Sequence, residues 1–241
     1  MKYRLNKLPV KTTNNFMIND IEIDLEIPDI LEFHDYKIIN SGDLIIEKKV
    51  LNGKITSRLG LTFSEYVELN IPQNKKIEKP VYISYDFSNS DNLIDKINIE
   101  YQDNSYCDFI ITYNSIDEGI HFHHLFESVK SNVGSCGNVT MINMLNNNSS
   151  NFIAIENDCL DNSNFTHNII DISGKTKIYN VFSNVYNNAK NYLNNIYIGC
   201  SNNILDMNYY LNNIGKSSTN QMIFEGVLFD SGGKFIFFHA D

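Results

Sequence analysis

The segment Phe152-Ile-Ala-Ile-Glu156 indicates the fold, because it belongs to a series of short apolar segments that return along the chain at a nearly fixed interval. A later member, Tyr192-Leu-Asn-Asn-Ile-Tyr-Ile198, has the same β-branched and aromatic character and the same rough alternation of apolar and polar residues. The midpoints of the series are Ile142, Ile153, Ile170, Val181, Ile198, Met207 and Phe224. The residue number rises from one midpoint to the next by 11, 17, 11, 17, 9 and 17, so a two-strand unit recurs at steps of 28 and finally of 26.

A period of this length is typical of a repeat architecture in which each unit buries its face against its neighbours. We therefore predict that residues 79–241 form an all-β solenoid core. All four prolines lie in the first third of the chain, as expected if the later strands need every backbone N–H for pairing on both edges. Asparagine tolerates left-handed backbone, so most of the asparagine pairs and triplets are predicted to mark corners, with inward ladders as the alternative. Examples are Asn146-Asn147-Asn148, Asn187-Asn188 and Asn194-Asn195.

Residues 1–78 are organised differently and are predicted to form a small N-terminal cap that covers the first open coil. Within this region Asn52-Gly53 separates two apolar stretches, 44–51 and 54–59, and this dipeptide favours the two-residue turn of a β-hairpin. The alternating segment Ile21-Glu-Ile-Asp-Leu-Glu-Ile27 predicts a further strand.

Charge excludes several classes of function. The net charge is -10 and the only arginines are Arg4 and Arg58, so the chain lacks the basic stripe that nucleic-acid binding requires. The N-terminus has no apolar signal-peptide core, and no apolar run is long enough to span a membrane. These features predict a cytoplasmic protein that has neither nucleic acid nor membrane as a partner.

Four cysteines, Cys107, Cys136, Cys159 and Cys200, are widely spaced and form no Cys-x-x-Cys pair. This spacing matches neither a zinc ribbon nor a self-contained cluster motif, and the simplest interpretation is four small apolar strand residues. The separation of Cys107 and Cys136 is close to one coil, but a drift of one residue places them on opposite faces of a sheet unless a bulge intervenes.

The segment Gly119-Ile-His121-Phe-His123-His124 holds the densest group of potential ligands. In a strand, His121 and His123 share one face and His124 takes the other, which gives a two-ligand geometry that a third group could complete. The alternative is that solvent-facing or hydrogen-bonded histidines happen to share a strand, since no carboxylate or cysteine follows at ligand spacing. His34, His167 and His239 are isolated and are assigned no role.

The order of motifs resembles the SufB/SufD family, the core scaffold subunits of the SUF iron-sulfur cluster assembly machinery. The resemblance begins with Leu8-Pro-Val-Lys-Thr12 and continues through Ile77-Glu-Lys-Pro-Val-Tyr-Ile83, Phe109-Ile-Ile-Thr-Tyr113 and the histidine segment. It ends with Gly215-Lys-Ser-Ser218 and Phe224-Glu-Gly-Val-Leu-Phe-Asp230. The resemblance implies a right-handed parallel β-helix that pairs with a second β-helical subunit, and a SufC-type ABC ATPase as a partner.

The sequence also departs from that family. In the family, the Phe-x-Gly-x-Leu strand is followed by further coils that carry functional residues and by ATPase-binding helices, whereas this sequence ends at Asp241. We expect a family member without the C-terminal part, and no functional residue of the family is carried over. The apolar run Phe235-Ile-Phe-Phe238 predicts an end that pairs with another chain, so a homodimer through the β-helix edge is an alternative to a SufB/SufD-like partner.

Three functions are compatible with these features. The main prediction is a non-catalytic scaffold or accessory subunit of iron-sulfur cluster assembly, without a tightly bound cofactor but able to hold a transient cluster within a complex. The metal ligands predicted for that role are His121, His123, Cys136 and Cys200, because imidazole and thiolate suit iron. The alternatives are a structural β-solenoid interaction module and a polysaccharide-acting enzyme, for which Asp158, Asp161 and Asp171 are available without an accompanying arginine.

Overall fold

The computed structural model of the 241-residue chain describes residues 2–5, 21–24, 37–57, 59, 62–89, 91–172, 174–200, 203–229 and 234–240. These residues form seventeen strands, and no helix occurs among them. None of these residues therefore forms a helix that is long and apolar enough to cross a membrane.

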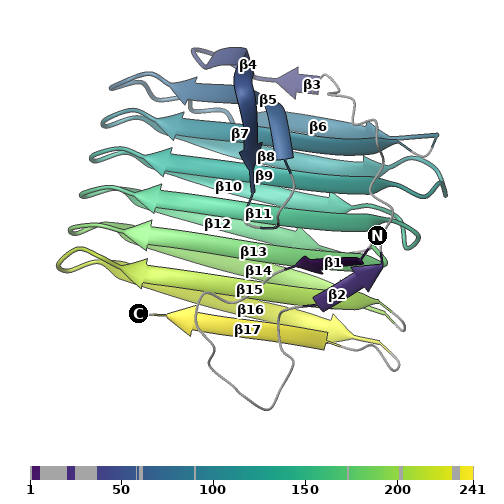
Figure 1. Ribbon diagram of the computed structural model, residues 1–241. Helices are drawn as coiled ribbons and strands as arrows, with labels where there is room; N and C mark the ends of the chain where they lie inside the picture. The colour runs from purple at the N-terminus through teal and green to yellow at the C-terminus, as the bar shows by residue number, and fades with distance from the viewer. Residues whose placement is uncertain are drawn as a thin grey trace.

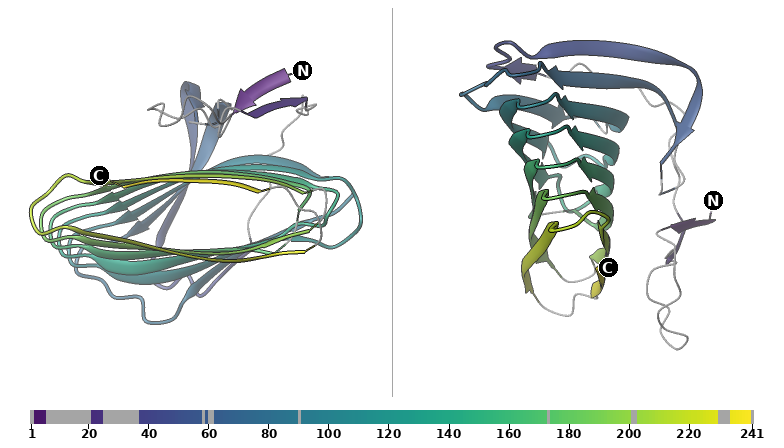
Figure 2. Two further views of the ribbon diagram at one scale, coloured as in Figure 1. Left: turned by 90° about the horizontal axis from the view of Figure 1, so that it is seen from below. Right: turned by 90° about the vertical axis from the view of Figure 1, so that its left-hand side faces the viewer.

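Two sheets stack their strands along a common axis and enclose an elongated interior (Figures 1 and 2). The seven-stranded sheet consists of β3 (Lys37–Ile39), β6 (Val81–Phe87), β8 (Tyr106–Ser115), β10 (Cys136–Met144), β12 (Asn164–Asp171), β14 (Lys190–Gly199) and β16 (Thr219–Leu228). The eight-stranded sheet consists of β4 (Ile45–Thr56), β5 (Thr62–Ile71), β7 (Asn92–Tyr101), β9 (Phe122–Ser131), β11 (Ser150–Cys159), β13 (Thr176–Val185), β15 (Ile204–Asn213) and β17 (Lys234–Ala240). Separately, β1 (Lys2–Leu5) pairs antiparallel with β2 (Ile21–Asp24), within the predicted 21–27 strand.

From β5 onward, consecutive strands alternate between the two sheets, and every pairing among these later strands is parallel. The prediction of an all-β parallel solenoid is therefore confirmed. Tyr106, Cys136, Asn164 and Lys190 lie side by side at the start of four stacked strands, so the residue number rises by 30, then 28, then 26 from coil to coil. The period predicted from the sequence is thus a mean around which individual coils vary.

One corner of the coil has the same length in most coils, and the other corner varies. The corner that enters the seven-stranded sheet has four residues in most coils, as in 102–105, 132–135 and 160–163. Its third residue has positive φ: Asn74, Asn104, Gly134, Asn162 and Asn188. In the longer corner 214–218 the fourth residue, Ser217, has positive φ instead. Asn and Gly adopt this left-handed backbone at low cost, which explains the corner asparagines. The opposite corner shortens by one residue per coil, from 116–121 to 145–149 and then to 172–175. The strand before it also shortens by one residue per coil, from β8 to β10 to β12, and the two changes together account for the decrease in coil length.

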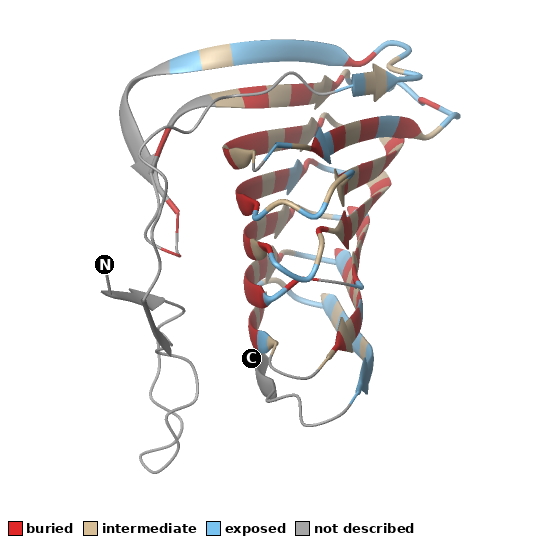
Figure 3. Cartoon of the chain, turned by 90° about the vertical axis from the view of Figure 1, so that its right-hand side faces the viewer, coloured by how far each residue is buried: buried red, intermediate tan, exposed pale blue. Residues whose placement is uncertain are grey.

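The core is the interior between the two sheets, where alternate residues of each strand meet (Figure 3). Strands β8 and β10 show alternation of buried and half-buried residues. Tyr101 packs edge to face against Phe109 and Phe165, at centroid distances of 6.2 and 6.0 Å. Each such buried apolar side chain contributes on the order of 1.5–3 kcal/mol, so the stack is stabilised coil by coil.

The prediction of a hairpin turn at Asn52-Gly53 is wrong. These residues lie inside β4, which pairs antiparallel with β5 and runs on to Thr56. Residues 51–54 face a single residue of β5, because Val50 pairs with Glu65 and Ile55 with Phe63. The irregularity accommodates the dipeptide as a bulge, which Gly favours, and the chain reverses only after β4 ends.

The β4–β5 hairpin bends away from the stack and lies over the outer face of the eight-stranded sheet (Figure 1). Phe63 of β5 contacts the rings of His124 and Phe126 at 5.4 and 5.9 Å, within a second apolar cluster outside the solenoid. Ser57 Oγ lies 3.0 Å from His124 Nε2. Parallel pairing begins with β5, upstream of Lys79, while the division of the chain at residue 78 stays a prediction. The side chains of the apolar run 235–238 lie outside the described residues.

Candidate functional site

Strand alternation directs several ionisable side chains into the interior of the solenoid. All are buried, and they come from strands of both sheets: Asp95 (β7), His123 and Glu127 (β9), His167 and Asp171 (β12), and Lys177 (β13). A buried charge without a partner costs several kcal/mol, so the pairing of these groups determines what the interior can do chemically.

The predicted histidine pair lies at the wall of this interior. His121 and His123 both pack against the ring of Phe87, at centroid distances of 5.6 and 5.5 Å, whereas His124 contacts Phe63 on the other face. His121 Nε2 lies 3.0 Å from Asp117 Oδ1. His123 places Nε2 3.1 Å from Asp95 Oδ1 and Nδ1 2.8 Å from Asn151 Oδ1. Both nitrogens of His123 are thus occupied, and a metal ion could bind this ring only after one contact is broken.

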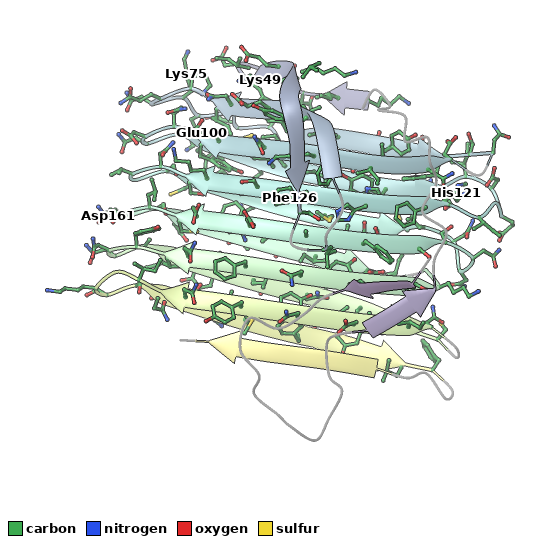
Figure 4. The ribbon with its side chains drawn as sticks, in the orientation of Figure 1. Lys49, Lys75, Glu100, His121, Phe126 and Asp161 are labelled. Atoms are coloured by element: carbon green, nitrogen blue, oxygen red, sulfur yellow. The ribbon has the colours of Figure 1, made fainter. Side chains whose placement is uncertain are left out.

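The two accessible cysteines lie far apart. Cys136 begins β10 and is aligned with Lys190 of β14 two strands away, whereas Cys200 follows the end of β14. Ten residues of extended strand span about 33 Å, so the two thiols lie at opposite ends of the seven-stranded sheet. The same opposition is visible in Figure 4, where His121 and Asp161 are on opposite corners. The structure therefore does not bring the four predicted ligands together, and among the described residues no three His, Cys, Asp or Glu side chains form a metal-ligating group.

The other two thiols are enclosed in the core. Cys107 is aligned with Gly137, one position beyond Cys136, so the register of this coil turns Cys107 inward and Cys136 outward. Burial, with a smaller contribution from Asp108, raises the pKa of Cys107 to about 12. Burial likewise raises the pKa of Cys159 well above its ordinary value. Since the thiolate is the reactive and metal-binding form, Cys136 and Cys200, both half-buried, are the cysteines with access to such chemistry.

Sequence reasoning missed the pair Glu127 and His167, whose Oε1 and Nε2 atoms are 3.7 Å apart. Burial, with a smaller contribution from the charge of Asp95, raises the pKa of Glu127 to about 8. Burial also lowers the pKa of His167 to about 3. At neutral pH the contact therefore joins an uncharged acid to an uncharged imidazole. The signal in the sequence is the parity of Glu127, which shares the inward face with His123.

Sequence reasoning also missed a buried ion pair. Lys177 Nζ lies 3.0 Å from Asp171 Oδ1 and donates to the carbonyl oxygen of Ile198 at 2.7 Å. The Tyr179 hydroxyl donates to Asp171 Oδ2 and accepts from Asn143 Nδ2 at 2.8 Å. Asp171 is thus held inside the core, while Asp158 lies half-buried on β11 and Asp161 in a corner. The carboxylates considered for a polysaccharide-acting enzyme do not form one cluster.

The sequence of residues 86–237 matches the family model described as SUF system FeS cluster assembly, SufBD core domain. The match covers more than half of the chain and extends from the end of β6 into β17, which is most of the parallel stack. The chain belongs to the SufBD core-domain family. None of the curated proteins matches it. The SufBD core of this chain contains the buried histidines, the buried Lys177–Asp171 pair and all four cysteines.

Proposed function

We propose that this SufBD core-domain protein is a non-catalytic scaffold or accessory subunit of SUF iron-sulfur cluster assembly. The observation that supports the proposal is the family match across residues 86–237, the part of the chain that forms the parallel stack. The partners proposed from family membership are a SufC-like ABC ATPase and a SufB/SufD-like subunit, and the place of action is the cytoplasm. A continuous stack of paired strands suits a subunit that positions partners.

The iron-sulfur cluster is the cargo in this role. We propose Cys136 and Cys200 as its thiol contacts, because the buried Cys107 and Cys159 are held protonated. Their separation of about 33 Å means that neither can join the other at one cluster. A cluster at either position would take its remaining ligands from a partner subunit. Such shared ligation leaves the cargo loosely held, as transfer requires. His121 and His123 remain proposed ligands for iron, subject to release from Asp117 and Asp95.

The first test is co-expression with and without a SufB-like subunit and a SufC-like ATPase from the same genome. Size-exclusion chromatography with light scattering then reports which chains comigrate. A stable complex supports the assembly role. A chain that binds neither partner would contradict it and would favour the structural interaction module. A glycan cleavage assay tests the polysaccharide-acting alternative.

The second test addresses the thiols. The variant Cys136→Ser/Cys200→Ser is compared with a matched control, Cys107→Ala/Cys159→Ala, in the purified complex. Bound iron and acid-labile sulfide are measured after reconstitution with ferrous iron and sulfide. We expect loading to fall in the first variant and to persist in the control. Unchanged loading in the first variant would remove the cysteines from the proposal.

A further inference from the structure

The first coil ends the stack with an open strand edge. β4 is the last strand of the eight-stranded sheet, and among the described residues it pairs with β5 alone (Figures 1 and 2). In an antiparallel pair, about half of the N–H and C=O groups of a strand point away from its partner, so the stretch 45–50 offers about three of each at the free edge. Such groups need hydrogen-bond partners, and a further extended chain can supply them.

Exposed apolar side chains lie on both faces of β4. Ile46 is aligned with the buried Leu69 of β5, so Ile46 and Val50 continue the inner face of the stack. They are 41% and 74% exposed, and Ile45 on the outer face is 48% exposed. Neighbouring strands lie about 4.8 Å apart and align their side chains on each face. A strand added beside β4 would therefore cover these three side chains.

A cavity of about 440 Å³ lies where β4 begins, between the turn before β4 and residues 76–79 of the link from β5 to β6. Two lysines line it, Lys76 and Lys79, and neither forms an ion pair within the part of the chain that the structure describes. Its two carboxylates are Glu78 and Asp43, and Lys75 Nζ binds Asp43 Oδ2 at 3.1 Å. The ammonium groups of the two lining lysines can therefore pair with a carboxylate from another chain.

The charge of this end of the stack is opposite to that of the whole chain. Residues 37–80 contain eight lysines and arginines against five aspartates and glutamates, a net charge of +3 in a chain whose total is -10. Figure 4 shows Lys49 and Lys75 at this end. At the other end, the edge strand β16 carries Glu225 and no basic residue. This distribution of charge draws an acidic partner to the β4 end and repels it from the other.

We propose that the free edge of β4 is a docking site for an acidic, extended segment of a partner protein, which adds to the eight-stranded sheet as a further strand. Backbone hydrogen bonds hold the segment, and its carboxylates pair with Lys76 and Lys79. A second copy of this edge fits poorly, because the lysines of β4 repel the same lysines of the copy. A lipid surface also fits poorly, because hydrocarbon chains offer no partners for the free N–H and C=O groups. The inference does not depend on the role in cluster assembly.

The test is the binding of a fluorescent peptide, Glu-Val-Glu-Thr-Glu-Val-Glu with blocked ends, to the natural chain, measured by anisotropy at low salt. One control peptide has lysine in place of glutamate. A second has proline in place of valine and threonine, so that it keeps the charge but cannot pair as a strand. We expect the natural chain to bind only the first peptide, and higher salt to weaken the binding. In hydrogen exchange, binding should protect amides of residues 45–50.

Two double variants test the lysines. Lys76→Glu/Lys79→Glu should bind the acidic peptide at least about tenfold more weakly, because two attractive contacts become repulsive. Lys190→Glu/Lys216→Glu is the matched control, because both lysines are exposed, lie in later coils and give the same change of net charge. This control should bind the peptide nearly as tightly as the natural chain does. Circular dichroism checks that both variants are folded.

Four results would overturn the proposal. The first is a natural chain that does not bind the acidic peptide at about 1 mM. The second is equal binding of the proline peptide, or equal binding by the two double variants. The third is protection from exchange at β16 or β17 in place of β4. The fourth is binding to vesicles of phosphatidylcholine and phosphatidylserine without binding to the peptide, which would identify a lipid surface instead.

Discussion

Replacement of Glu127 by Gln should abolish a specific loss of stability that the natural chain shows as pH rises toward 8. Burial raises the folded-state pKa of Glu127 from 4.5 to about 8, so the folded protein keeps a proton that the unfolded chain releases. Stability therefore falls by about 1.4 kcal/mol per pH unit as pH rises between these two values, and it levels off above the folded pKa. Between pH 6.5 and 8 the loss amounts to about 2 kcal/mol.

The interval above pH 6.5 isolates this effect. The pKa of the neighbouring His167 is lowered by burial to about 3, so its contribution is complete above pH 6.5 and is lost only as pH falls below that value. The free energy of unfolding by urea is measured at intervals from pH 6.5 to 8.5, with refolding checked at each pH. The difference in stability between Glu127→Gln and the natural chain should change by about 2 kcal/mol across the interval, in favour of the variant as pH rises.

Glu100→Gln is the matched control, because Glu100 lies on the outer side of β7 and the substitution changes the charge of the unfolded chain by the same amount. The control should follow the natural chain. If Glu127→Gln also followed the natural chain, the carboxyl group would already be ionised at pH 6.5 and would form an ion pair with a protonated His167. That result would refute the assignment of an uncharged pair.

Three other predictions concern the core. Lys177→Met should lower the free energy of unfolding by about 3–5 kcal/mol, because it leaves the buried Asp171 carboxylate without its cation. Adding Asp171→Asn to this variant should recover part of the loss. Equal urea midpoints for the single and the double variant would contradict this prediction. Gly137→Ala should lower the free energy of unfolding by about 1–3 kcal/mol, because the new Cβ would lie 2.5 Å from the carbonyl oxygen of Cys107. The melting temperature should fall by about 2–4 °C for each kcal/mol. An unchanged melting temperature would show that the strand moves aside freely. A thiol reagent should modify Cys136 and Cys200 rapidly in the folded chain, and Cys107 and Cys159 only after unfolding. Mass spectrometry of peptides identifies the labelled cysteines. Rapid labelling of Cys107 or Cys159 would contradict the assignment of these thiols to the core.

The contrast between Asn188 and Asn195 shows how far local sequence predicts this fold. Both belong to asparagine pairs predicted at corners. Asn188 has positive φ at a corner, as predicted, whereas Asn195 lies within β14 with its side chain buried and its amide donating to the Tyr209 hydroxyl. Local composition is the same at both positions. The difference lies in what the neighbouring coils place opposite each residue, and that information is absent from the pair itself.

The error at Asn52-Gly53 has a similar cause. The dipeptide favours a two-residue turn, but β4 and β5 pair on both sides of it, and tertiary pairing turned the same flexibility into a bulge.

The histidine segment shows the limit for the candidate site. Its alternation places His123 inward, but only the stacking of neighbouring coils places Asp95 and Asn151 against its two nitrogens.

The sequence by itself determined the all-β class and the mean coil length, because the periodic apolar pattern and the corner asparagines are local and repeat. Tertiary structure alone decided which polar groups meet inside. Glu127 on β9 and His167 on β12 belong to different sheets, and they face each other only because the intervening corners have particular lengths. A slip of one residue in the register of a strand would turn all of its side chains to the opposite face, so the register of the coils determines the chemistry of the interior.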